Sequence, residues 1–376
     1  MISPHNKYKI ALIGFRLAKG GAEKALANLS IFFDKNGIEV HNIIVLDDVS
    51  YNYSGKLINL GKLKDSSNGV LNKLKRLIYL KKYLKQNQFD YIIDFRPRTK
   101  YFQELFISKW LYQSKVIFSV RSYLIDYYMP NWTFLTQFMY GKCFKIVAIT
   151  NVTRELILEK HQLKNVVTIY NPIIFEDIIT ASNQEINLKF QYIIGVGQME
   201  TNVKQFDKLI EAYSKSTLPI NNIHLVLLGD GKRKSIFQDL AKNQKVEDKV
   251  HFLGHQVNPM PFIKKARFLV LSSLNEGMPN VILEALACQT PVIAFDCLSG
   301  PSEMIIDKQN GLLVENQNLE KLTEAMNLFV CDKELFEHCK KNTLQSIQQF
   351  SIENIGKQWL DLMKIGNAFN IADIEL

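Results

Sequence analysis

The sequence predicts an α/β protein of two domains, each a doubly wound parallel sheet with helices on both faces. Its 376 residues are more than one core usually organises. Short β-branched runs alternate with helix-length amphipathic segments along nearly the whole chain. These short runs are apolar throughout, which is typical of parallel strands buried on both faces.

The predicted strands form two series separated by a proline. The first series comprises 9–15, 39–46, 90–95, 115–120, 145–150 and 166–170. The second comprises 192–197, 223–231, 250–254, 266–273, 291–295 and 311–314. Because Asn171-Pro172 ends the first series and a polar stretch follows, we predict domains at 1–172 and 173–349. Ligands of such sheets bind beyond the carboxyl ends of the strands, where the strand order reverses.

Composition argues against a membrane-spanning protein and against a disulfide-rich one. With 47% apolar and 22% charged residues, the chain has the make-up of a soluble globular protein. No apolar run approaches the roughly 18 to 20 residues that cross a bilayer. The five cysteines form no C-x-x-C pair, which indicates a reducing cytoplasm and no disulfide framework.

Positive charge is concentrated in the first half. Residues 1–172 hold 26 Lys and Arg against 12 Asp and Glu, whereas the rest of the chain holds 20 against 25. This asymmetry is compatible with a nucleic-acid face, an anionic-membrane face or an ordinary solvated surface.

Two glutamates stand in the otherwise apolar stretch NEGMPNVILEALACQTPVIAF (275–295). A helix is expected to begin at Pro279 or Asn280, so its N-terminus and Gly277 could hold a phosphate. Glu276 lies in the loop and Glu284 one turn into the helix. Carboxylates beside a diphosphate would accept hydrogen bonds from sugar hydroxyls, which favours a nucleotide sugar. The alternative for Glu284 is a buried pair with an arginine or lysine.

Two glycine-containing loops are further candidates for binding phosphate. Gly20 and Gly21 precede an amphipathic helix, although a purely structural loop would look the same. After the strand that ends at Gly197 we expect a helix from residue 202 or 203, with Lys204 in its first turn. A cation is unfavourable there unless it shares a bound anion with the helix N-terminus. The alternative is an exposed lysine with no role.

Other signals for chemistry are weaker. The glycine turns at 227–235 and 252–258 could cradle a nucleoside. No D-x-D or G-x-S-x-G motif occurs. His251 and His255 are four residues apart but span a strand and a glycine turn, so no metal is expected.

The stretch NEGMPNVILEALACQTPVIAFDCLSGPSEMI followed by NGLLV resembles glycosyltransferase family 4. Further matching points are GGAE near the start, IYNP at the junction, GVGQMETNVKQFDKLIEA and LLGDG. The resemblance covers nearly the whole C-terminal half and scattered points before it. It implies the GT-B fold, in which two such domains face one another across a cleft, with 350–376 as a helix that crosses back to the first domain. It also implies a retaining, metal-independent transferase with no cofactor and a nucleotide sugar as co-substrate.

The resemblance also implies roles for individual residues. Glu276 would bind the sugar hydroxyls, Glu284 the ribose and Lys204 the diphosphate, with Glu276 and Lys204 as the catalytic pair. The other donor-binding positions are Gly20, Gly21, Gln198, Gly229, Gly254, Gly277, Met278, Pro279 and Asn280. Gln198 stands where the family usually has arginine, so Lys204 or Arg121 would supply the missing phosphate cation.

The acceptor is expected on the basic first domain. Residues 73–89 form a basic amphipathic segment, and 100–115 interleave aromatic residues with lysine. Either segment could contact an anionic leaflet, or both could simply pack on the first sheet. We therefore expect a UDP-sugar donor and a polyprenyl-diphosphate-linked glycan acceptor in bacterial surface-polysaccharide synthesis. The expected location is the cytoplasm, at the cytoplasmic face of the inner membrane.

Two other functions remain open from the sequence. A nucleotide-sugar epimerase could share the fold, although no acid and base residues can be assigned to it. A nucleic-acid-binding protein would use the basic half but leaves Glu276 and Glu284 unexplained. A dehydrogenase is disfavoured because neither G-x-G is followed by a third glycine.

Overall fold

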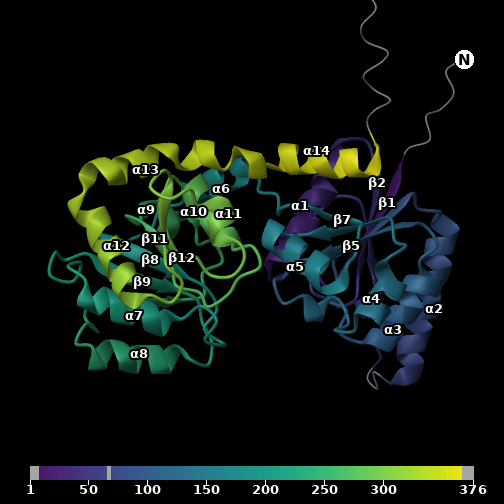
Figure 1. The fold of residues 1–376 in the computed structure, drawn as a ribbon, viewed down its shortest axis with the longest axis horizontal. Helices are drawn as coiled ribbons and strands as arrows, with labels where there is room; N and C mark the ends of the chain where they lie inside the picture. The colour runs from purple at the N-terminus through teal and green to yellow at the C-terminus, as the bar shows by residue number, and fades with distance from the viewer. Residues whose placement is uncertain (1–7, 66–68, 366–376) are drawn as a thin grey trace, which may run out of the picture. The chain divides into compact units, whose positions relative to one another are not determined.

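A computed structural model describes residues 8–65 and 69–365 of the chain. Contacts divide the chain into two compact units (Figure 1). Unit 1 comprises Met1–Pro172 and Ile352–Leu376, and unit 2 comprises Ile173–Ser351. The domain boundaries predicted from the sequence follow residues 172 and 349. Residues 1–7, 66–68 and 366–376 of the predicted domains lie outside the described residues.

Unit 1 is built on a seven-stranded parallel sheet with the order β3-β2-β1-β4-β5-β6-β7. Its strands are β1 (Lys9–Gly14), β2 (Glu39–Ile44), β3 (Lys56–Asn59), β4 (Tyr91–Asp94), β5 (Lys115–Val120), β6 (Lys145–Ala148) and β7 (Val166–Thr168). Every strand except β3 overlaps a predicted strand. The edge strand β3 has four residues, of which only Ile58 is buried, so it carries too little apolar pattern to be recognised.

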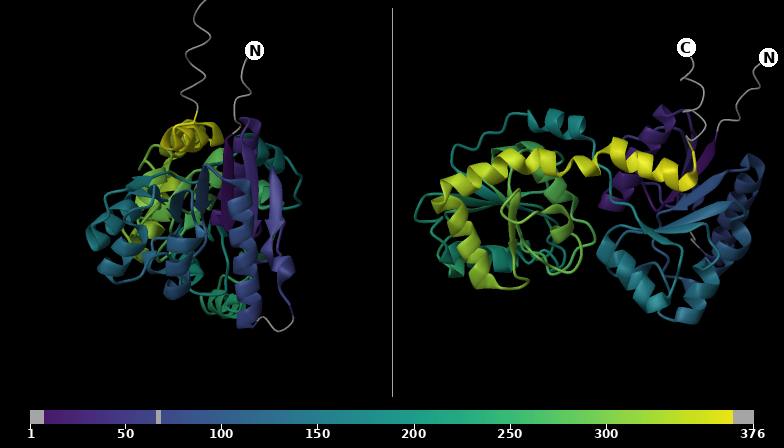
Figure 2. Two further views of the ribbon diagram at one scale, coloured as in Figure 1. Left: turned by 90° about the vertical axis from the view of Figure 1, so that its right-hand side faces the viewer. Right: turned by 45° about the horizontal axis from the view of Figure 1, so that its top comes forward.

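Helices cover both faces of this sheet. They are α1 (Gly21–Lys35), α2 (Val70–Asn87), α3 (Tyr101–Phe106), α4 (Thr133–Tyr140), α5 (Asn151–His161) and α14 (Ile352–Met363), with short turns η1 (Leu60–Leu63), η2 (Ile107–Leu111) and η3 (Ile125–Tyr127). One core cluster joins Ala11 and Ile13 of β1 to side chains of α2, η2 and α4. On α14, Gly356 lies against the ring of Phe32 in α1, where a Cβ would be 2.4 Å away (Figure 2).

Unit 2 is a six-stranded parallel sheet with the order β10-β9-β8-β11-β12-β13. Its strands are β8 (Tyr192–Val196), β9 (His224–Leu228), β10 (Val250–Gly254), β11 (Leu269–Leu271), β12 (Val292–Phe295) and β13 (Gly311–Val314). Its helices are α6 (Phe175–Ser182), α7 (Phe206–Lys215), α8 (Lys234–Asn243), α9 (Met260–Lys265), α10 (Asn280–Ala287), α11 (Pro301–Met304), α12 (Leu319–Cys331) and α13 (Lys333–Ser346), with the turn η4 (Gln348–Phe350). Helices α7, α8 and α12 pack together, and α6, α9, α10 and α13 form a second group.

The predicted fold class is confirmed, since each unit is a Rossmann-like parallel sheet with helices on both faces. The strand order reverses between β1 and β4 in unit 1 and between β8 and β11 in unit 2. Loops that follow these strands are therefore where a ligand site is expected. None of the helices in the described part of the chain has the length and apolarity needed to span a bilayer.

Candidate functional site

Lys204 lies in the loop between β8 and α7, not in the helix. The prediction of a helix from residue 202 or 203 is wrong, because α7 begins at Phe206 and Gln205 has a positive φ of 45°. The backbone N–H of Leu274 donates to the carbonyl of Val203 at 2.8 Å, which ties this loop to the one after β11. The stem of Lys204 packs on Gly197, where a Cβ would be 2.8 Å from its Cγ. A tertiary contact therefore overrides the local helical pattern.

Glu276 follows β11 and forms an ion pair with Lys204. Nζ of Lys204 is 2.5 Å from Oε1 of Glu276, and Oγ of Ser273 donates to the same oxygen at 2.6 Å. The two side chains are 22% and 12% exposed, so the pair is partly screened from water yet open to a ligand. Among the described residues, the second oxygen, Oε2, has no hydrogen-bond partner. The loops after β8 and β11 thus meet where the strand order of unit 2 reverses.

The loop that carries Glu276 is fixed on its other side by the loop after β12. Asn275 forms a parallel bridge with Leu298, and Oγ of Ser299 donates to the carbonyl of Gly277 at 3.0 Å. Gly300 has a φ of +105°, and a Cβ there would be 2.6 Å from Cδ of Pro279. The carboxylate is therefore held on a loop anchored by backbone contacts at both ends.

Helix α10 begins as predicted, at Asn280 with Pro279 as its N-cap. Pro279 itself makes no side-chain hydrogen bond to this helix end. Met278 and Pro279 are buried, whereas Gly277 and Asn280 are half-buried. Glu284 is also half-buried, while its neighbours Leu283 and Ala285 are fully buried. Glu284 is therefore less buried than its neighbours on the helix.

Glycines bring the turns after β8, β9 and β10 into direct contact. A Cβ at Gly229 would be 1.8 Å from the carbonyl oxygen of Gly197, and one at Gly231 would be 2.3 Å from the backbone of Glu200. The N–H of Gly229 also donates to the carbonyl of Gly254 at 2.8 Å. Packing between turns accounts for Gly229 and Gly231, so the role of Gly229 in donor binding stays a prediction.

Two of the predicted donor positions in unit 2 face more open space. Gly254 has a φ of +72°, and a Cβ there would approach only Asp230 and Lys234, at 3.9 and 4.0 Å. Gln198 is exposed and lies between Gly197 and the buried Met199. Both residues border the same group of turns as Lys204, so a ligand over these turns could reach them.

Gly20 and Gly21 lie in unit 1, at the start of α1. Gly20 is the N-cap with a φ of 129°, and its N–H donates to the hydroxyl of Tyr51 at 3.1 Å. A Cβ at Gly20 would be 2.7 Å from Oε2 of Glu23, because that carboxylate turns back over the helix start. Burial raises the pKa of Glu23. An acidic group already occupies this helix end, so an anion site there stays a prediction.

Arg121 follows β5 and is buried within unit 1. Its Nη1 donates to Oδ1 of Asn171 at 2.9 Å, and its guanidinium lies 4.7 Å from the ring of Phe95 and 6.0 Å from that of Trp359. Nε and Nη2 are buried without a partner in residues 8–65 and 69–365. Burial lowers the pKa of Arg121 to about 10. Cation–π packing explains this placement, and a role with phosphate or acceptor stays a prediction.

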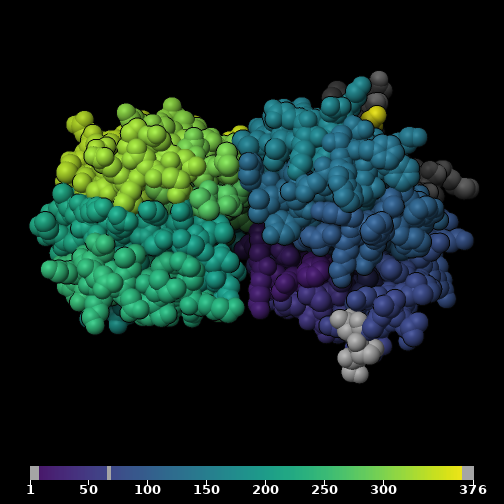
Figure 3. Space-filling model, turned by 60° about the horizontal axis from the view of Figure 1, so that its bottom comes forward, coloured from purple at the N-terminus to yellow at the C-terminus, as the bar shows by residue number. Residues whose placement is uncertain are grey.

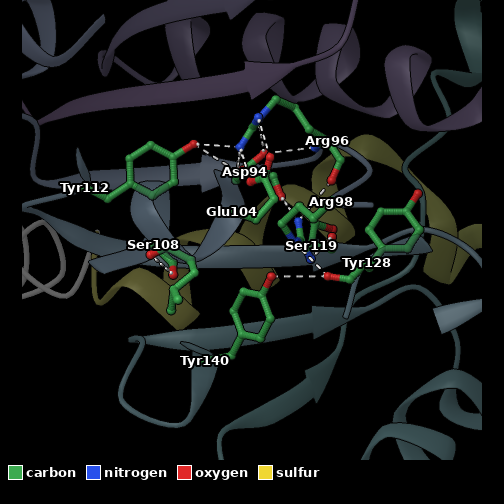
Figure 4. Close-up of polar contacts among 10 residues, drawn as sticks. Asp94, Arg96, Arg98, Glu104, Ser108, Tyr112, Ser119, Tyr128 and Tyr140 are labelled. Carbon is green, nitrogen blue, oxygen red and sulfur yellow. Dashed lines mark hydrogen bonds and ion pairs between the residues drawn. The ribbon is translucent and has the colours of Figure 1, made fainter. Parts of the chain in front are cut away.

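A buried charged cluster at the end of β4 was not predicted from the sequence (Figure 4). Nη2 of Arg96 lies 2.7 Å from Oδ2 of Asp94 and 3.0 Å from Oε2 of Glu104. The hydroxyl of Tyr112 donates to the same Asp94 oxygen at 2.9 Å. Burial would raise the pKa of Asp94, but Arg96 and Arg98 outweigh it and lower that pKa. At Glu104 burial prevails over Arg96 and raises the pKa.

Arg98 completes this cluster and is fully buried. It donates to the carbonyls of Tyr128, Arg96 and Ser119 at 3.1 to 3.2 Å (Figure 4). Its guanidinium lies 5.0 Å from the ring of Phe118. Charged residues directly after an apolar strand, in the segment DFRPR, are the sequence signal that could have revealed the cluster. Ser273, which donates to Glu276, was also not predicted. Its position three residues before Glu276 is the sequence signal that could have revealed this contact.

Two histidines of unit 2 stack with an aromatic ring. His251 contacts His224, with Nε2 and Nδ1 2.8 Å apart, and Phe190 stacks on both rings. His255 is exposed in the following turn. Within the described ranges, no group of three or more His, Cys, Asp or Glu residues could hold a metal ion.

Comparison with known proteins supports a glycosyltransferase. Residues 178–346, which contain Lys204, Glu276 and Glu284, match the family model described as glycosyl transferases group 1. The chain is 28% identical over 366 residues to a transferase of Campylobacter jejuni, covering 94% of this chain and 98% of the relative. That relative is named N-acetylgalactosamine-N,N'-diacetylbacillosaminyl-diphospho-undecaprenol 4-alpha-N-acetylgalactosaminyltransferase.

Solved structures agree in fold. A glycosyltransferase from Rickettsia africae superposes with a TM-score of 0.74 at 19% identity, covering 96% of this chain and 98% of that chain. Anabaena Alr3699/HepE in complex with UDP and glucose gives a TM-score of 0.76 at 16% identity, covering 95% and 99%. The fold is that of GT-B glycosyltransferases, and the family match together with the relatives supports a glycosyltransferase.

Proposed function

We propose that this protein is a retaining glycosyltransferase of family 4 that moves a sugar from a UDP-linked donor to a hydroxyl of a polyprenyl-diphosphate-linked glycan. The observation that carries the proposal is the Lys204–Glu276 pair at the strand-order reversal of unit 2. The pair lies within residues 178–346, which match the family model. The names of the Campylobacter relative and of the Anabaena complex support the acceptor and the UDP moiety, respectively.

The pair has the remaining hydrogen-bonding capacity that such a donor needs. An ammonium group has three N–H donors, and Lys204 uses one of them on Glu276. The others would donate to oxygens of the diphosphate as it leaves. Oε2 of Glu276 would accept from a hydroxyl of the sugar. Because the pair is largely screened from water, its charges stabilise the departing diphosphate more strongly than they would in bulk solvent.

The start of α10 completes the proposed donor site. Backbone groups of Gly277 to Asn280 would support the sugar and phosphate, and the half-buried Glu284 would bind the ribose hydroxyls. The acceptor hydroxyl would attack on the face from which the diphosphate leaves, with a donor phosphate oxygen taking its proton. The proposal requires neither a metal nor another cofactor.

Thermal denaturation with a panel of UDP- and GDP-sugars tests the donor. Saturating UDP-sugar is expected to raise the midpoint by about 5 °C, because a ligand that binds only the native state stabilises it. The shift should persist in EDTA and be absent in Lys204→Gln, whereas Lys321→Gln, which removes an exposed lysine–glutamate pair, should retain it. Stabilisation by GDP-sugars alone would contradict the UDP assignment, and conversion of the donor without acceptor would favour the epimerase.

We also propose that unit 1 contacts an anionic membrane, at the cytoplasmic face of the inner membrane. Helix α2 exposes a row of apolar side chains at helical spacing: Val70, Leu71, Leu74 and Ile78 are 80%, 83%, 51% and 60% exposed. Lysines 75, 81 and 82 are exposed on the same helix. Figure 3 shows, in blue, the side of unit 1 to which this part of the chain belongs. An apolar row flanked by lysine is typical of helices that lie in the interface of an anionic bilayer.

Flotation with anionic vesicles tests the membrane contact. We expect salt-sensitive binding that Leu71→Asp reduces, because the variant puts charge on the exposed apolar row. Ile220→Asp in unit 2 changes an apolar residue that is similarly exposed and should bind like the wild type. Equal flotation of the two variants would exclude α2 as the contact.

A further inference from the structure

Unit 1 contains a pocket of about 290 Å³ beside the strand-order reversal of its sheet. Its interior is formed by buried aliphatic side chains, namely Ile13, Leu60, Leu80 and Ile107. The half-exposed Leu77 and Val45 continue this apolar lining towards the surface. The walls of the pocket come from strand ends and from helices α2 and α3. Secondary structure on several sides therefore fixes the shape of the pocket. The volume is at the lower end of the range for small-molecule sites.

Three cationic side chains surround the exposed part of this pocket. Lys73 and Arg76 come from α2, and Lys100 precedes α3. None of the three forms an ion pair within residues 8–65 and 69–365. Moreover, Nε of Arg76 is buried and has no hydrogen-bond partner among the described residues. A desolvated donor on a half-buried arginine is costly unless an acceptor binds to it.

The charged groups at the inner end of the pocket neutralise one another. Arg96 and Glu104 line this end, and their hydrogen-bonded ion pair at 3.0 Å belongs to the cluster with Asp94 and Arg98 (Figure 4). The cluster therefore balances two carboxylates against two guanidinium groups. The unbalanced charge of the pocket lies in Lys73, Arg76 and Lys100. Its chemistry is therefore apolar inside and cationic outside.

We propose that this pocket binds the head end of an acceptor lipid, an aliphatic chain that carries a diphosphate. Its first carbons would lie against Leu60, Leu77 and Leu80, and its diphosphate would accept hydrogen bonds from Arg76 with Lys73 and Lys100 nearby. The inference rests on the proposed function, and it places the lipid of the acceptor in unit 1. Helix α2 would then serve both purposes, with its exposed row on the bilayer and its opposite side on the lipid head.

Calorimetric titration of the full chain with farnesyl diphosphate tests this site. Farnesol and inorganic pyrophosphate are each expected to bind about tenfold more weakly, because each lacks half of the complementary chemistry. Arg76→Gln should weaken farnesyl diphosphate binding about tenfold. Lys85→Gln, which removes an exposed cation from the same helix outside the pocket, should change it less than about twofold. Leu77→Trp should block binding of the aliphatic part of farnesyl diphosphate. Lys100→Gln provides a second variant of a pocket cation, at an exposed position.

Three outcomes would overturn the inference. They are pyrophosphate binding as tightly as farnesyl diphosphate, unchanged binding in both Arg76→Gln and Leu77→Trp, and displacement of farnesyl diphosphate by UDP. The UDP thermal shift of the same preparations separates this inference from the proposed function. A chain that responds to UDP but not to farnesyl diphosphate retains the transferase proposal and loses the lipid site. The opposite pattern removes the transferase proposal.

Discussion

Replacing Glu276 by glutamine is expected to lower the rate of sugar transfer about 100-fold to 1,000-fold, the usual cost of removing one charged or donor group that stabilises a transition state. The variant keeps the size of the side chain and its contact with Ser273, but loses the charge paired with Lys204. UDP affinity should persist, since Lys204 then has all its donors available for the diphosphate. The measurement is UDP release with acceptor, alongside UDP titration.

The matched control for this prediction is Glu315→Gln. Glu315 pairs with Lys321 at 2.6 Å, but both side chains are more than half exposed. Its replacement should leave transfer within about twofold of the wild type, because exposed pairs contribute little. Full transfer activity in Glu276→Gln would disprove the role assigned to this carboxylate. An equal loss in Glu315→Gln would show that the effect is not specific to the site.

Replacing Arg96 by methionine is expected to lower the free energy of unfolding by about 3 to 5 kcal/mol at neutral pH, because two buried carboxyl groups lose their partner. Asp94 is fully buried and Glu104 is 4% exposed, so water cannot replace the guanidinium. In the wild type the lowered pKa of Asp94 contributes stability above the pKa of an unfolded aspartate. The difference between the two proteins should therefore shrink as pH falls through the range in which carboxyl groups protonate.

Denaturant titration at several pH values measures this effect. Arg154→Met is the control, since Arg154 forms an exposed pair with Glu155 and its loss should cost less than about 1 kcal/mol. If Arg96→Met does not fold, Arg96→Lys tests the same point, because lysine keeps the charge but not the planar fork that reaches Asp94 and Glu104 together. A wild-type free energy of unfolding in Arg96→Met would contradict the argument.

The alternation of apolar runs and amphipathic segments predicts the fold because parallel strands buried on both faces leave a strong pattern. The strand β3 (Lys56–Asn59) was not predicted, because an edge strand of four residues with one buried side chain has almost no apolar pattern. The predicted start of α7 is wrong for a different reason. The contact between Leu274 and Val203 joins two loops that are far apart in sequence, and local propensity contains no information about it.

The candidate site is predictable to a similar extent. A carboxylate and a lysine after neighbouring strands are recognisable from the sequence, because strand order places such loops together. Their direct pairing is not, since it depends on how the stem of Lys204 packs on Gly197. The cations around Arg76 belong to a segment recognised only as basic. Their arrangement around an apolar pocket depends on how α2 docks on its sheet.

The position of α14 has a consequence for biosynthesis. Unit 2 is formed by one continuous stretch, so it can complete its folding as soon as Ser351 has left the ribosome. Unit 1 must wait for Trp359, which is fully buried, and for Gly356, which lies on Phe32. Until α14 has been made, the newly synthesised first half exposes an apolar surface on α1, which chaperones can bind. Translation that stops early would therefore leave the first half incomplete even though all of its strands had already been made.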